Sequence, residues 1–345
     1  MTNSRSLNIS LGILSMAIMV YTLKTLQSIF IPLTFAIFLT FLFHPINRFM
    51  KDKRIPVSVN MLVLVVIILF TFTLMGAIVY TSIASFVTEF PKYEEALSEM
   101  TKSFFTFIDM PFENVTSFLN NKVNWFQIAD KLSLSKILSG TMGTFIDFFV
   151  KLLLTIVFML FILIDRDDLN KRVKKVLAED RISLSENLVG KIGEQINKYI
   201  VNKTLISLAT GLISMIFIAI FGIDFVVISG LLIFILNYIP NVGSIIASAF
   251  PIIICFIQYG LSWQLVAISS ALVTTQMVIG NFVEPRVMGH ELQLTPLFVL
   301  ISLIFWFWVW GPVGMILAVP LTSAITIIIK EIPSLKVISA LISYD

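Results

Sequence analysis

Charged side chains are scarce in this chain of 345 residues, since Asp, Glu, Lys and Arg together make up 13% of it and hydrophobic residues 57%. Soluble domains carry roughly twice this share of charge. The composition therefore indicates an integral membrane protein. The 24 basic and 21 acidic side chains give a net charge of only +3, so nothing in the composition suggests a nucleic-acid partner.

Cysteine and histidine are almost absent as well. The one cysteine, Cys255, lies in an apolar run and is interpreted as a small apolar filler, so an intrachain disulfide and a cysteine-based metal site are excluded. The two histidines, His44 and His290, have no clustered carboxylates beside them. The phosphate-loop pattern G-x-x-x-x-G-K-[ST] does not occur either. We therefore expect no enzyme, no cofactor, no metal and no ATPase within this chain.

What the chain has instead is a series of long apolar runs, which predicts an all-α polytopic membrane protein. The first two runs are predicted to form a helical hairpin and not a cleaved signal peptide, because no A-x-A-like site follows the first of them. The third run is long enough that it must tilt or project beyond the membrane. The runs cover residues 11–20, 26–43, 57–85, 145–164, 204–221, 225–238, 244–257, 263–282, 297–310 and 313–329.

Two of these runs are too short to cross a bilayer easily. Residues 225–238 and 297–310 would each form about 21 Å of helix at ~1.5 Å per residue, against a hydrocarbon core of about 30 Å. Each precedes a break that contains proline and glycine, NYIPNVG and WGPVG. The sequence leaves two readings open: each pair of runs is a re-entrant hairpin, or it is two tilted short spans.

The distribution of basic residues predicts the orientation. Residues 44–56 carry Arg48, Lys51, Lys53 and Arg54 against one acid, and residues 165–203 carry nine basic side chains, so both segments are expected to be cytoplasmic. Residues 86–144, with seven acids and five lysines, are expected outside. This arrangement places both termini in the cytoplasm.

The same features divide the chain into six segments. Amphipathic patterns predict helices in the extracytoplasmic insertion and in the cytoplasmic segment. The predicted segments are N-terminal membrane spans at 1–86, an extracytoplasmic helical insertion at 87–144, a membrane span at 145–164, cytoplasmic amphipathic helices at 165–203, a core with broken helices at 204–330 and a cytoplasmic tail at 331–345.

Polar residues inside the apolar C-terminal half are the candidates for function. Ser269, Gln276, Gly280 and Glu284 follow each other at spacings of seven, four and four, which places them on one face of a helix, with Asn281 close by. One interpretation is a polar lining for a solute or ion path. The other is interhelical hydrogen bonding that only holds the bundle together. For Glu284, a local ion pair with Arg286 at the membrane edge is favoured.

The first break offers a second group of candidates. The amides of Asn237 and Asn241 flank Pro240, where they can contact a neutral polar solute or, equally well, satisfy freed backbone groups as a structural cap. Gly243 and Ser244 follow and are small enough for a close helix approach.

Three ordered sequence blocks resemble the autoinducer-2 exporter family of bacterial membrane permeases. They are NYIPNVGSIIASAFP, NFVEPRVMGHELQLTP at residues 281–296 and WGPVGMILAVPLTSA at residues 310–324. Weaker matches extend upstream through FIPLTFAIFLTFLFHPINRFM and FILIDRDDL, so the resemblance covers nearly the whole chain. Asn241 departs from the pattern, because a tyrosine-like residue often follows Ile-Pro in the family.

The resemblance implies a secondary-carrier-like permease with about eight membrane segments, broken or re-entrant hairpins included. It also implies an extracytoplasmic insertion and a homo-oligomer, with five subunits as one candidate number. Members of the family are assigned to export of the quorum-sensing signal autoinducer-2, and others to sodium(lithium)/proton antiport. The residues that match the family pattern are Asn237, Pro240, Gly243, Glu284, Pro285, Arg286, Gly289, Pro296, Gly311, Gly314 and Pro320.

The leading hypothesis is export of a small polar solute, such as autoinducer-2, across the bacterial inner membrane by alternating access. The expected path residues are Asn237, Asn241, Ser244, Gln276, Asn281, Glu284 and Arg286, and the expected breaks and hinges are Pro240, Gly243, Pro285, Gly289, Pro296, Gly311, Gly314 and Pro320. A sodium(lithium)/proton antiporter, with Glu284 or Asp224 as the coupling carboxylate, is the first alternative. A membrane scaffold that transports nothing is the second.

Overall fold

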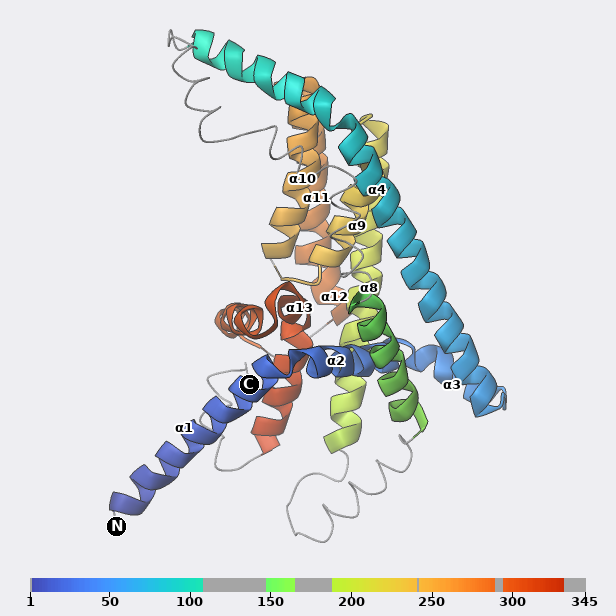
Figure 1. Cartoon of the computed structure of the whole chain (residues 1–345), viewed down its shortest axis with the longest axis vertical. Helices are drawn as coiled ribbons and strands as arrows, with labels where there is room; N and C mark the ends of the chain where they lie inside the picture. The colour runs from blue at the N-terminus through green and yellow to red at the C-terminus, as the bar shows by residue number, and fades with distance from the viewer. Residues whose placement is uncertain (1, 108–146, 165–187, 241, 289–293, 332–345) are drawn as a thin grey trace. The chain divides into compact units, whose positions relative to one another are not determined.

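The computed structural model describes residues 2–107, 147–164, 188–240, 242–288 and 294–331 (Figure 1). Every regular element in these ranges is a helix, which confirms the predicted all-α class. The described helices are α1 (Thr2–Thr25), α2 (Gln27–Leu42), α3 (His44–Asp52), α4 (Val57–Phe107), the helix Asp147–Ile164, α8 (Leu188–Ile220), α9 (Val226–Leu236), α10 (Val242–Tyr259), α11 (Trp263–Val278), the π-helix η1 (Ile279–Val283), α12 (Glu284–Met288) and α13 (Pro296–Glu331).

Within the described ranges, six helical stretches are long and apolar enough to cross a membrane. The bent pair α1 and α2 would make a seventh membrane segment, and α9 is a shorter apolar helix. Together they confirm a polytopic membrane protein, with six to seven spanning candidates among the described residues. The six stretches are Val57–Phe86, Asp147–Ile164, Gly193–Ile220, Val242–Tyr259, Trp263–Met288 and Pro296–Ile327.

The first two apolar runs meet at a sharp bend. The helices α1 and α2 are bent by 88° relative to each other near Leu26. Lys24 stands next to this bend, between the two apolar runs. The backbone continues to turn by local bonds, since the Leu26 amide donates to the Thr22 carbonyl. The sequence did not predict this bend, because apolar run lengths do not show the angle between two successive helices.

The predicted soluble helices are partly within the described residues. The helix α4 continues past its apolar part to Phe107, so the insertion begins as helix. Residues 108–146 and 165–187, which carry the rest of the insertion and most of the cytoplasmic segment, lie outside the described residues. The helix α8 runs without a break through Lys203.

The chain divides into two compact units, each assembled from separate stretches of sequence. Unit 1 comprises residues 1–65, 150–204 and 286–345, and unit 2 comprises residues 66–149 and 205–285. In unit 1, Ile196, Tyr199, Ile200 and Val319 form a buried apolar cluster. In unit 2 the buried cluster is larger and takes residues from α4, α8, α9, α10 and α11: Tyr93, Ile218, Ile223, Ile233, Ala247, Ile254, Cys255, Ile268 and Leu272. The cluster includes Cys255, as the apolar filler interpretation predicts.

Candidate functional site

The helices α9 and α10 of unit 2 form a hairpin. The 11 residues of α9 extend for only about 16 Å, roughly half of a hydrocarbon core. A short turn then carries Pro240, and α10 starts at Val242. The turn is so tight that a Cβ atom on Gly243 would lie 1.8 Å from the Leu236 carbonyl oxygen. Only glycine fits at this point of the hairpin tip.

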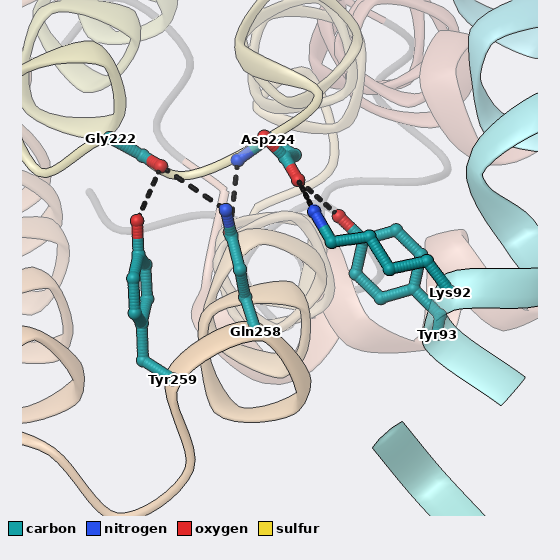
Figure 2. A network of polar contacts seen from close by, with 6 residues as sticks. All are labelled: Lys92, Tyr93, Gly222, Asp224, Gln258 and Tyr259. Carbon is teal, nitrogen blue, oxygen red and sulfur yellow. Dashed lines mark hydrogen bonds and ion pairs between the residues drawn. The ribbon is translucent and has the colours of Figure 1, made fainter. Parts of the chain in front are cut away.

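The two ends of this hairpin are bonded to each other. The Gln258 side chain at the end of α10 accepts from the Asp224 amide at 3.2 Å and donates to the Gly222 carbonyl at 3.3 Å (Figure 2). The Tyr259 hydroxyl donates to the same carbonyl at 2.9 Å. The chain therefore enters and leaves this hairpin at one place, as it would in either of the two open readings. The length of α9, about half of what a span needs, favours a re-entrant hairpin.

Asp224 at the base of the hairpin also contacts α4. The Tyr93 hydroxyl donates to the Asp224 carboxylate at 2.6 Å, and the Lys92 ammonium lies 3.8 Å from the same oxygen (Figure 2). The Tyr93 side chain is only 4% exposed. Burial, and then the bond to Asp224, raise the pKa of Tyr93 above the ordinary tyrosine range. The phenol therefore stays protonated and keeps donating to the carboxylate.

Phe225 completes this base. It takes a left-handed backbone conformation with φ of 59°, which is strained for a residue with a bulky side chain. Its ring packs against Phe86 and Tyr93, with centroids 5.3 Å and 5.6 Å away. The aromatic packing compensates for the strain and fixes the turn between α8 and α9. We call Lys92, Tyr93, Gly222, Asp224, Gln258 and Tyr259 the base network.

The predicted path residue Asn237 is buried at the hairpin tip. Its amide nitrogen donates to the Ser207 hydroxyl of α8 at 3.1 Å. Further along the two helices, a Cβ atom on Gly211 would lie 2.9 Å from the Gly230 carbonyl, so the backbones of α8 and α9 are in close contact. The hydrogen bond to Ser207 is the specific contact that a structural role of Asn237 requires. The hairpin packs directly against α8.

The predicted polar stripe on α11 is interrupted by the π-helix η1. Each i→i+5 turn takes one residue more than an α-turn, so Glu284 does not follow Gln276 and Gly280 at ideal α-helical spacing. Gly280 and Asn281 are exposed in the single chain, whereas the Gln276 amide nitrogen is buried and has no partner within the described residues. That these residues share one face of the helix stays a prediction.

The remaining predicted residues of this region have simpler surroundings. Glu284 and Arg286 lie two positions apart on α12. Ser244 is half-buried on α10 beside Gly243. Pro296 is the first residue of α13, where no amide donor is needed. Pro285 lies inside the continuous helical stretch Trp263–Met288, just after the π-helix. Asn241 and Gly289 lie outside the described residues.

The second break forms a fold-back inside α13, which belongs to unit 1. Gly311 has a φ of 64°, and the Trp306 indole donates to the Thr322 hydroxyl at 3.1 Å. In a straight helix these two residues would be about 24 Å apart at ~1.5 Å per residue. A Cβ atom on Gly314 would lie 2.1 Å from the Trp306 carbonyl oxygen. The two arms of α13 therefore fold back on each other, as in the first hairpin, while Pro320 lies within the second arm.

Two side chains tie this second hairpin to the bend between α1 and α2. The Trp310 indole donates to the Leu23 carbonyl at 3.0 Å, and the Lys24 ammonium lies 3.8 Å from the centre of the Trp308 ring. Such a cation–π contact gains strength where water is excluded. We call the contacts of Trp310 with Leu23 and of Trp308 with Lys24 the clasp. The sequence analysis did not predict it, although a lysine between two apolar runs was a visible signal.

A second lysine that sequence reasoning placed in the cytoplasmic segment is Lys203. It lies inside the apolar stretch Gly193–Ile220 and is only 2% exposed. Buried charges inside a membrane span are costly and usually functional. The signal was the helical periodicity of α8, which continues through residue 203 without a break.

Comparison with known proteins gives a family match over nearly the whole chain. The AI-2E family transporter model matches residues 12–334, which include all three sequence blocks. The relative named "Putative transport protein YhhT", from Escherichia coli K12, is 28% identical over 332 residues, covering 92% of this chain and 88% of the relative. The AI-2 transport protein TqsA of the same organism is 28% identical over 346 residues, covering 99% and 96%. A protein of Haemophilus influenzae named "Putative transport protein" is 27% identical over 332 residues, covering 94% of this chain and 92% of the relative.

Proposed function

The chain belongs to the AI-2E transporter family and is a multi-pass membrane transport protein. We propose that it exports a small polar solute by alternating access. Autoinducer-2 is the first candidate solute, because one relative is named for its transport. The proposed setting is the bacterial inner membrane, with a homo-oligomer of this chain, for which five subunits is one candidate number, and both termini in the cytoplasm. Monovalent cations are the alternative substrate.

The observation that carries the proposal is the pair of helical hairpins. Non-helical backbone at membrane depth is tolerated only where protein buries it or a water-filled cavity meets it. Discontinuous helices of this kind form the substrate sites of many secondary transporters. Both hairpin tips here depend on glycine, at Gly243 and at Gly311 with Gly314.

The proposed path residues are the polar groups next to these breaks: Asn237, Asn241, Ser244, Gln276, Asn281, Glu284 and Arg286. Small residues and prolines supply the proposed breaks and hinges. In this proposal Asn237 holds the tip through Ser207, and Gln276 offers a buried amide to the solute.

The test is solute flux in proteoliposomes of the purified full chain, with labelled autoinducer-2 loaded on one side. Saturable flux supports the exporter. Two variants then separate the roles of Asn237. If Asn237 acts only through Ser207, then Asn237→Ala, Ser207→Ala and the double variant reduce flux equally. If Asn237 also contacts solute, Asn237→Ala raises the half-saturating concentration and Ser207→Ala does not.

A sodium(lithium)/proton antiporter is the second candidate, and the π-helix before Glu284 favours it. Segments of this kind occur frequently at functional sites, and this one lies inside the apolar stretch Trp263–Met288. Asp224 is the less favoured candidate for the coupling carboxylate, because its carboxylate already accepts a hydrogen bond from Tyr93 and pairs with Lys92. Internal pH is followed during sodium and lithium pulses. A pH change that is lost in Glu284→Gln, without solute flux, supports the antiporter hypothesis over the exporter hypothesis. No signal in either assay supports the scaffold hypothesis.

A further inference from the structure

The short helix α3 lies between two apolar membrane segments. The helix α2 ends at Leu42, α3 runs over His44–Asp52, and the long apolar helix α4 begins at Val57. Because only one residue separates α3 from α2 and four separate it from α4, α3 has to lie close to the boundary of the membrane.

The two faces of α3 differ in chemistry. Ile46 and Phe49, three positions apart and therefore on one face, are 37% and 62% exposed. Arg48 lies on the opposite face, and no residue of α3 is buried in the chain. The unit therefore leaves an apolar edge of this helix uncovered.

The orientation of α3 is fixed by its contacts within unit 1. The Asn60 amide of α4 donates to the Asn47 side-chain oxygen, and the Ile55 amide donates to the Met50 carbonyl at 3.1 Å. Arg54 takes a left-handed conformation with φ of 55°, which ends the helix and turns the chain into α4. The exposed apolar edge thus belongs to a helix that is held in place.

Basic residues accompany this edge. Residues 44–56 hold four Lys and Arg side chains, Arg48, Lys51, Lys53 and Arg54, against the single acid Asp52, a net charge of 4 − 1 = +3 with histidine neutral. The Lys53 ammonium lies over the Phe49 ring at 5.9 Å from its centre. A lysine at this place keeps its charge at the edge of the apolar face.

We propose that α3 lies in the membrane interface and binds the headgroups of anionic phospholipids. Ile46 and Phe49 insert among the acyl chains, while Arg48 and Lys53 contact the phosphates. Interfacial helices combine an apolar face with basic residues in this way. Each Lys or Arg near an anionic surface contributes roughly 1 kcal/mol, or about a fivefold change in affinity. This lipid site is independent of the solute that the chain transports.

The insertion of α3 is tested by spin labels in a Cys255→Ala background of the full chain. Labels at Phe49→Cys and Arg48→Cys are compared in vesicles of phosphatidylcholine and phosphatidylglycerol. We expect the label at position 49 to collide mainly with oxygen, and the label at position 48 mainly with a water-soluble nickel chelate. Equal exposure of both labels to the nickel chelate overturns the proposal.

The charge requirement is tested by titrating phosphatidylglycerol into the detergent-purified chain and counting bound lipids by native mass spectrometry. Arg48→Gln/Lys53→Gln should weaken binding about 25-fold, from about fivefold per charge. Arg48→Lys/Lys53→Arg, the matched control, should bind as the wild type does, and phosphatidylcholine should bind equally to all three. Equal phosphatidylglycerol binding by both double variants overturns the proposal, and so does full displacement by inorganic phosphate, which indicates a site for the free ion.

Discussion

At the scale of single residues, Gly243 occupies a place where the tip of the α9–α10 hairpin leaves no room for a side chain. The atom in the way is the Leu236 carbonyl oxygen, which would lie 1.8 Å from a Cβ atom at position 243, and a backbone atom cannot rotate aside. Gly243→Ala should therefore force the tip open, destabilise the protein by about 1–3 kcal/mol and abolish transport. The measurements are thermal unfolding in detergent and proteoliposome flux.

The chain offers a matched control for this variant. Nothing lies within 4 Å of a Cβ atom at Gly76, which also stands in an apolar helical stretch. Gly76→Ala should leave both unfolding and flux unchanged. If the two variants behave alike, the tip of the hairpin tolerates a side chain and does not act as a constrained break.

Tyr93 gives a prediction with a direction in pH. Tyr93→Phe removes the hydrogen bond to Asp224 and should cost about 1–2 kcal/mol. The pKa of Tyr93 is raised in the folded protein, while the unfolded chain ionises near the ordinary value of about 10. The stabilisation is therefore complete below pH 10 and falls as the pH rises further. The melting-temperature gap between wild type and variant should stay constant from neutral pH to about 9 and shrink above about 10.

The control for Tyr93 is Tyr80→Phe, on an exposed tyrosine of the same helix. It should show no gap at any pH. Lys92 is present in all three proteins, so its own contribution cancels in the comparison. A Tyr93→Phe gap that widens above pH 10 would contradict the assigned direction of the pKa.

At the scale of elements, the lengths of the apolar runs predicted the short arms, and the proline and glycine positions predicted both breaks. Run length alone could not show that the two arms of each pair fold back on each other. Contacts between distant residues show it: Gln258 with Gly222, and Trp306 with Thr322. The base network could not be predicted from the sequence either. Tyr93 and Asp224 are 131 residues apart, so no helical periodicity relates them.

The π-helix and the N-terminal bend show a second limit of sequence reasoning. The two four-residue steps from Gln276 through Gly280 to Glu284 assume an unbroken α-helix, and no residue type marks a π turn. The 88° bend at Leu26 involves no glycine, and the proline of α2, Pro32, lies well beyond it. The contacts of Trp310 with Leu23 and of Trp308 with Lys24 lie next to it.

This clasp yields a prediction about the second hairpin. Trp310→Phe removes the donor to the Leu23 carbonyl and leaves that oxygen unpaired beside a buried side chain. The expected cost is about 1–3 kcal/mol. Trp308→Phe keeps an aromatic face for Lys24 at an exposed site and should cost less than half as much. Thermal unfolding of both variants measures the difference, and an equal loss in the two would remove the special role of the Trp310 bond.

At the scale of the whole molecule, most of the surface of the candidate membrane spans is not buried by the residues that the structure describes. The share of each candidate span that is buried ranges from 11% in Val57–Phe86 to 39% in Gly193–Ile220. In a soluble protein such faces would drive aggregation. They fit lipid contact, and they leave room for the neighbouring copies of a proposed homo-oligomer.

The sidedness of the termini is the last prediction, and it depends on how α1 and α2 enter the membrane. A re-entrant hairpin returns the chain to its starting side, so α9–α10 and the fold-back of α13 do not change the orientation of the segments around them. The bent pair α1 and α2 is either one broken span or a re-entrant loop. With Arg5 before the first apolar run, and basic residues in the 44–56 loop, the positive-inside tendency favours a re-entrant loop and a cytoplasmic N-terminus.

Single cysteines in a Cys255→Ala background test this arrangement, with a membrane-impermeant maleimide applied to intact cells and to inverted vesicles. Ser4→Cys, Arg48→Cys and Ser343→Cys should react only in inverted vesicles, and Leu261→Cys, at the exposed turn after α10, only in intact cells. If position 4 alone changes sides, α1 and α2 together form one broken span. In that case the chain crosses the membrane once more than proposed, while the orientation of both hairpins is unchanged.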